Sequence, residues 1–167
     1  MIKTAGLLLL FFTSLMTGYS YSERLSERVR LLRALRLLLT RFSRELTVRR
    51  PELSRLFMSD NNASTSIITG RIAELLDSGS SPEESVRAAF CEPYPKRLLK
   101  QDERDYLTSV LAQLGGGDVS SALKVPGDCA CSVDEYIESA VLDERKKAKA
   151  GLSLSVYIGL AAVILLM

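Results

Sequence analysis

The chain has 167 residues, the length of one domain, with a formal charge of +2 and a mean hydropathy of +0.11. Histidine is absent, which excludes Ser-His-Asp and Cys-His catalytic pairs, histidine-ligated haem and most zinc sites. Charged residues make up 25% of the sequence, so a positive mean hydropathy requires the apolar residues to be concentrated, and they lie at the two ends.

The first predicted element is an uncharged stretch at residues 5–21. As a helix it would be roughly 25 Å long, close to the ~30 Å hydrocarbon thickness of a bilayer. Lys3 is the one basic side chain before this stretch, whereas six arginines follow it between residues 24 and 41. The positive-inside rule therefore predicts a retained anchor with the following region in the cytoplasm. Residues 18–20 also fit a signal-peptidase site, so a cleaved signal peptide is the alternative.

A long amphipathic helix is expected to follow directly. Its apolar positions recur every three or four residues and form one helical stripe: Leu25, Val29, Leu32, Leu35, Leu39, Phe42 and Leu46. Arg30, Arg33, Arg41 and Arg44, here called the arginine face, fall on the opposite side. Pro51 ends any extension, because the residue before a proline is pushed out of helical geometry.

Short amphipathic helices are predicted through the middle of the chain. They cover residues 53–57, 68–76, 82–92 and 98–114. Residues 59–64 form a loop, and Ser78-Gly79 ends the second of these helices. Ser81 supplies an N-cap ahead of Pro82 and two acids. The third helix ends before Pro93, and the glycines from Gly115 end the fourth.

The last predicted helix begins at a capping box of Ser132 and Glu135. It continues through the basic run before residue 149 into the uncharged residues 150–167, a second predicted membrane span. No stretch alternates with a period of two residues, so no sheet is expected. The fold class is therefore all-α: an antiparallel helical bundle at residues 22–149, flanked by an N-terminal (1–21) and a C-terminal (150–167) transmembrane helix.

Charge is divided along the sequence. Residues 22–60 hold ten arginines and five acids, a net charge of +5, and residues 61–148 hold ten basic and fifteen acidic residues, a net charge of −5. One reading is that the two parts pair within one fold. The other is that the arginine face meets anionic lipid or an acidic partner, with the acidic region 74–105 as the second candidate contact.

The sequence contains no recognisable catalytic or cofactor-binding motif. Cys91, Cys129 and Cys131 could supply three thiolates, but no histidine can complete a zinc set and a lone C-x-C is a weak signal. No carboxylates are paired on an apolar surface as acid–base catalysis would need. We therefore expect no enzymatic activity, cofactor, metal or nucleic-acid partner.

The order of these features resembles one family, stage III sporulation protein AB of endospore-forming bacteria. The resemblance is carried by Glu45-Leu46-x-x-x-x-Pro51-x-Leu53, by Leu114-Gly115-x-x-Asp118, by the stretch at residues 30–35 (RLLRAL), and by the closing residues 158–166 (IGLAAVILL). It spans the whole chain. Two departures are a Pro-Gly pair within residues 125–131 and the loop at residues 59–64, which indicate a divergent member. Pro51, Leu53, Leu114, Gly115 and Asp118 match the family by position and are interpreted as structural.

The resemblance implies a helical domain similar to the platform (F) protein of type II secretion and type IV pilus systems. It also implies membership of the channel in the mother-cell membrane around the forespore, needed for forespore development. The expected partners are other channel subunits, in particular the secretion-type ATPase stage III sporulation protein AA, together with membrane lipid and a possible second copy of the chain. The alternative is an exported, C-terminally anchored receptor or adhesion module.

Overall fold

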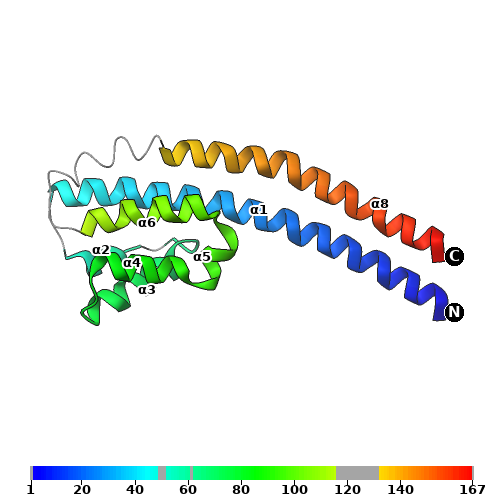
Figure 1. Ribbon diagram of the computed structural model, residues 1–167, viewed down its shortest axis with the longest axis horizontal. Coiled ribbons are helices and arrows are strands. Elements are labelled where there is room, and N and C mark those ends of the chain that lie inside the picture. The colour runs from blue at the N-terminus through cyan, green and yellow to red at the C-terminus, as the bar shows by residue number, and fades with distance from the viewer. Residues whose placement is uncertain (1, 49–51, 61, 116–131, 167) are drawn as a thin grey trace. The chain divides into compact units, whose positions relative to one another are not determined.

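The computed structural model describes residues 2–48, 52–60, 62–115 and 132–166, and every regular element among them is helical (Figure 1). The helices are α1 (Ile2–Val48), α2 (Leu53–Met58), α3 (Ser66–Asp77), α4 (Pro82–Cys91), α5 (Pro93–Leu98), α6 (Gln101–Gly115) and α8 (Lys149–Leu166). Residues 132–143 are also helical and continue through a π-helical turn, Glu144–Ala148, into α8. The predicted all-helical class is confirmed, and so is an unbroken last helix.

The chain divides into two compact units, and α1 contributes to both. The hairpin unit consists of Met1–Val29 and Glu138–Met167, and the bundle unit consists of Arg30–Ile137. The division predicted at residues 21 and 150 stays a prediction.

The bundle unit has a core of large aliphatic and aromatic side chains. In the part of α1 that belongs to this unit, the predicted stripe is buried from Leu32 to Phe42, and Leu31, Ala34 and Leu38 widen it. Phe42 meets Phe57 of α2 edge-to-face at a centroid distance of 4.9 Å. Helix α3 packs against α2 and α4, and α4 packs against α6. Burial of this continuous apolar face, rather than helix propensity, holds these short helices together.

The predicted stop after α3 and the predicted start of α4 are confirmed by their hydrogen bonds. Gly79 has φ +88°, and the backbone N–H groups of Gly79 and Ser80 donate to the carbonyls of Leu76 and Leu75, which is a Schellman motif. Ser81 then accepts a hydrogen bond from the Glu84 backbone N–H and donates to its carboxylate.

The region around Pro93 differs from the prediction. Pro93 begins the additional helix α5 instead of only ending α4, because a proline in the first turn lacks an N–H that would have no helical partner anyway. Helix α6 consequently begins at Gln101 and not at Leu98. The buried Glu103 carboxylate accepts the Lys100 backbone N–H at 2.9 Å and so closes the start of α6.

The two predicted membrane-spanning segments are helical, as parts of α1 and α8. Within the described part of the chain, however, no helix has the length and apolar character required to cross a bilayer. The prediction of flanking transmembrane helices is therefore not supported.

Candidate functional site

The arginine face is an exposed stripe on α1, within the bundle unit. Arg30, Arg33, Arg41 and Arg44 are all exposed. Leu37 lies in the middle of the stripe, four residues from both Arg33 and Arg41, and is 65% exposed. An exposed leucine among arginines has the composition of a protein-binding surface, in which an apolar centre is surrounded by charged side chains.

The structure assigns Arg41 a second role within the bundle unit. Its Nε lies 2.7 Å from Glu45 Oε1, and its terminal nitrogens donate to the carbonyl and hydroxyl oxygens of Ser59 at 3.1 and 3.3 Å. These bonds connect α1 to the turn that follows α2. Arg41 is therefore partly occupied inside the fold, which makes Arg30, Arg33 and Arg44 the better candidates for external contact.

The alternative electrostatic reading, pairing between the basic and acidic parts, is confirmed for two other arginines. Arg36 Nε lies 2.6 Å from Asp134 Oδ1 in the bundle unit, and both side chains are about half exposed. Arg28 lies 3.1 Å from Asp143 in the hairpin unit, with side-chain exposures of 7% and 18%. Neither arginine belongs to the arginine face, so internal pairing and an external basic surface coexist on one helix.

In the hairpin unit, two antiparallel helices pack against each other through small residues. Ser14 Oγ donates to the Ser155 carbonyl at 2.7 Å. A methyl group at Gly18 would lie 2.8 Å from Ser155 Cβ, and one at Gly151 would lie 3.0 Å from the ring of Tyr21. These residues recur at four-residue intervals in each helix, and this spacing lets two helix backbones approach closely. The four-residue spacing of small residues is visible in the sequence, but the helical stripes of large apolar residues do not include it, so this contact was not predicted.

Polar contacts join the same two helices near the π-helical turn. Ser26 Oγ donates to Glu144 Oε1 at 2.5 Å, and Asp143 pairs with both Arg28 and Lys147, the latter at 2.8 Å. A π-helical turn widens the helix locally and is frequent at functional sites. The partly buried carboxylate of Asp143 thus has two cations around it.

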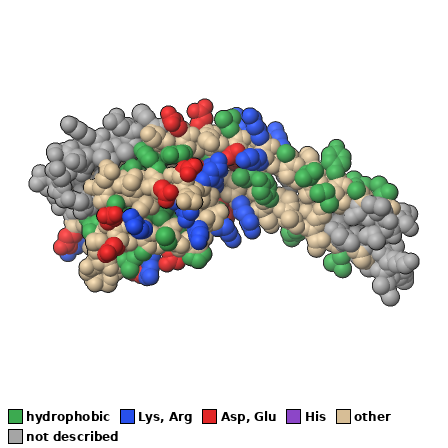
Figure 2. Space-filling view, viewed as in Figure 1, with side chains coloured by type: hydrophobic (Ala, Val, Ile, Leu, Met, Phe, Trp, Pro, Cys, Tyr) green, Lys and Arg blue, Asp and Glu red, His purple; other side chains and the backbone are tan. Residues whose placement is uncertain are grey.

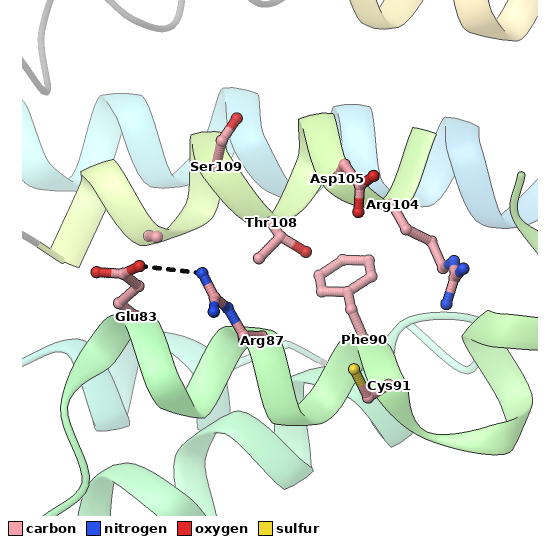
Figure 3. A pocket seen from close by; sticks show the side chains of 9 residues that line it. Glu83, Arg87, Phe90, Cys91, Arg104, Asp105, Thr108 and Ser109 are labelled. Atoms are coloured by element: carbon pink, nitrogen blue, oxygen red, sulfur yellow. Dashed lines mark hydrogen bonds and ion pairs between the residues drawn. The ribbon is translucent and has the colours of Figure 1, made fainter. Parts of the chain in front are cut away.

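A second surface of the bundle unit is a groove of about 470 Å³ between α4 and α6 (Figure 3). Phe90 projects from α4 toward Thr108 of α6, and Arg87 extends toward Glu83 at 3.4 Å. Arg104 Nε is buried and has no hydrogen-bond partner among the residues that the structure describes. Cys91 is exposed at the rim. The groove therefore mixes both signs of charge with the aromatic ring of Phe90.

The residues that match the family by position lie at ends of helices where the structure describes them. Leu53 is the first residue of α2, and Leu114 and Gly115 are the last two residues of α6. Pro51 and Asp118 lie outside the described residues, as do Cys129 and Cys131. The structural interpretation of these five positions stays a prediction.

The comparison with known families decides the identity of the chain. Stage III sporulation protein AB matches residues 3–167, essentially the full length. The chain belongs to this family. No curated protein and no solved structure matches it. Membership of the family places the chain in stage III of sporulation, and the predicted resemblance is confirmed.

Proposed function

We propose that this member of the stage III sporulation protein AB family is a non-enzymatic scaffold that holds a partner subunit of the sporulation apparatus at a membrane. The observation that carries the proposal is the arginine face with Leu37 exposed at its centre. Leu37, which is 65% exposed, gives these arginines an apolar centre that a partner can bury, as at the core of a protein–protein interface.

The proposed partner is an acidic surface of the secretion-type ATPase stage III sporulation protein AA. Arginine forms bidentate hydrogen bonds with carboxylates, so the exposed Arg30, Arg33 and Arg44 can orient an acidic surface as well as attract it. The groove between α4 and α6 is a second contact surface, for other channel subunits.

The hairpin unit supplies the association with the membrane. Its exposed large hydrophobic side chains include Leu9, Phe12, Met16, Leu154, Tyr157 and Ile164. Along the hairpin, Lys and Arg side chains lie next to the region where hydrophobic side chains predominate (Figure 2). A basic surface next to an apolar one suits a bilayer, in which the charged headgroups lie next to the acyl chains. The proposed location is the mother-cell membrane around the forespore, with the bundle unit facing the cytoplasm.

Co-purification with the ATPase tests the scaffold proposal. In the full-length chain carrying both Arg30→Glu and Arg33→Glu, the amount of ATPase that co-purifies is expected to fall by about tenfold or more. The reason is that the reversed charges repel the acidic surface. Arg55→Glu is the control, since Arg55 is 81% exposed on α2 and pairs with the neighbouring Glu52. Equal retention by both variants would remove the arginine face as the contact.

The exposed thiol of Cys91 tests the orientation. In a chain with Cys129 and Cys131 changed to serine, a membrane-impermeant maleimide should label Cys91 after lysis but not in intact cells. Labelling in intact cells would place the bundle unit outside and favour an exported module.

A further inference from the structure

A groove of about 680 Å³ runs along the hairpin unit, between the amino-terminal part of α1 and the start of α8. Its walls are formed by Thr17, Gly18 and Tyr21 on one side and by Gly151, Leu154 and Ile158 on the other. Lys147 lines it at the end nearest the π-helical turn. The eleven-residue separation between Lys147 and Ile158 corresponds to about 16 Å along a helix, roughly half the hydrocarbon thickness of a bilayer.

The groove exists because the contact between the helices is made by small residues. Glycines at 18 and 151 bring the backbones together but contribute no side chain to cover the space beside them. The residues that border this space remain exposed, with Leu154 at 61%, Ile158 at 57% and Tyr21 at 45%. An apolar channel that is open along its length favours an elongated apolar occupant, since burial of its walls stabilises by about 25 cal/mol per Å².

The end of the groove at Lys147 is basic. Residues 143–149 contain two acids, Asp143 and Glu144, and four basic side chains, so the segment has a net charge of +2. Asp143 already pairs with Arg28 and Lys147, and Glu144 accepts the Ser26 hydroxyl. The exposed Arg145, Lys146 and Lys149 therefore leave an excess of positive charge at this end.

We propose that the hairpin groove binds one anionic phospholipid, with an acyl chain along the apolar walls and the phosphate at the basic end of residues 145–149, where Lys147 lines the groove. The groove combines an apolar channel about one leaflet long with a cationic end, which matches both parts of such a lipid. The proposal rests on the membrane association proposed above, and it adds a defined site that selects the charge of the headgroup.

Native mass spectrometry of the full-length chain in a neutral detergent tests this site. The protein is titrated with phosphatidylglycerol, with phosphatidylcholine and with inorganic phosphate. One bound phosphatidylglycerol is expected at lipid concentrations where phosphatidylcholine binds at least about fivefold more weakly, because one lysine near an anionic headgroup contributes about that factor. Inorganic phosphate should not displace the bound lipid, since it cannot fill the apolar channel.

Two variants locate the binding. Ala150→Trp adds a large side chain to an exposed residue that lines the groove and should abolish the specific adduct. Ala161→Trp, an exposed position of α8 that does not line the groove, is its matched control. Lys147→Gln should weaken phosphatidylglycerol binding by about fivefold and leave phosphatidylcholine binding unchanged.

Equal binding of the two phospholipids, or an adduct that persists in Ala150→Trp, would overturn the lipid site. Displacement by inorganic phosphate would show an anion site without an acyl-chain channel and would overturn it as well. Because retention of the ATPase is measured separately with variants of the bundle unit, failure of the lipid site leaves the scaffold proposal to its own test.

Discussion

The two units of this protein are held together by opposite kinds of contact. The bundle unit buries large side chains such as Leu32, Phe42 and Ile72, whose apolar area supplies the stabilisation. The hairpin unit packs through small residues such as Gly18 and Ser155, with hydrogen bonds and a partly buried ion pair between its helices. Of the large apolar side chains that the structure describes in this unit, most are exposed. Apolar content alone therefore does not locate a core, because in the hairpin unit the apolar side chains form an outer surface.

The largest effect is expected from truncation in the core of the bundle unit. Leu32→Ala should lower the free energy of unfolding by about 2–5 kcal/mol, because Leu32 has no exposed surface and its removal leaves a cavity. Urea denaturation followed by circular dichroism measures the change. Leu37→Ala is the control on the same helix and should change stability by less than about 0.5 kcal/mol. Similar losses in both variants would contradict the distinction between core and exposed leucines.

Overpacking the hairpin contact is expected to have the next largest effect. Gly18→Leu should destabilise the pairing of α1 with α8 by about 1–3 kcal/mol, since even a methyl group at Gly18 is too close to Ser155. Hydrogen exchange of the amides in residues 138–160 reports the loss. Gly6→Leu introduces the same side chain on the same helix, where a methyl group meets nothing within 4 Å, and should leave exchange unchanged.

The two arginine–aspartate pairs should contribute differently to stability, because one is more buried than the other. Arg28→Gln should cost about 1–2 kcal/mol, because it leaves the partly buried Asp143 with Lys147 as its remaining charged partner. Arg36→Gln removes a half-exposed pair and should cost at most about 1 kcal/mol. Thermal unfolding of both variants at low and high salt checks the order. A larger loss for Arg36→Gln would show that burial does not rank these pairs.

The smallest effect is a stabilisation. Gly70→Ala in α3 should raise the stability of the bundle unit by about 0.5–1 kcal/mol, since alanine is the better helix former and a methyl group there meets nothing within 4 Å. Gly79→Ala is its counterpart. It should destabilise, because Gly79 has a positive φ that a side chain disfavours. The two changes together test whether the backbone conformation of a glycine sets the sign of the stability change when alanine replaces it.

Features that depend on neighbours in the chain were predictable from the sequence. The Ser81 cap, the stop at Gly79 and the apolar stripe of α1 follow from local hydrogen bonding and from the helical period, and all three are present. The family resemblance was also readable, because it depends on the order of motifs along the chain. The end of a helix before Pro93 was predicted correctly, but the helix that begins at Pro93 was not, since a proline can both end one helix and begin the next.

Tertiary structure alone decided which of several similar residues face inward. In the run Leu37-Leu38-Leu39 only Leu37 is exposed, and among the arginines of α1 only Arg28 is buried, because the helices that pack against α1 cover one side of it. The close approach at Gly18 and the groove beside it likewise require two segments more than a hundred residues apart to meet. The sequence by itself determined where the helices form and which family they belong to. Packing between distant segments determined which surfaces remain exposed, including the arginine face and the groove for which a partner and a lipid are proposed.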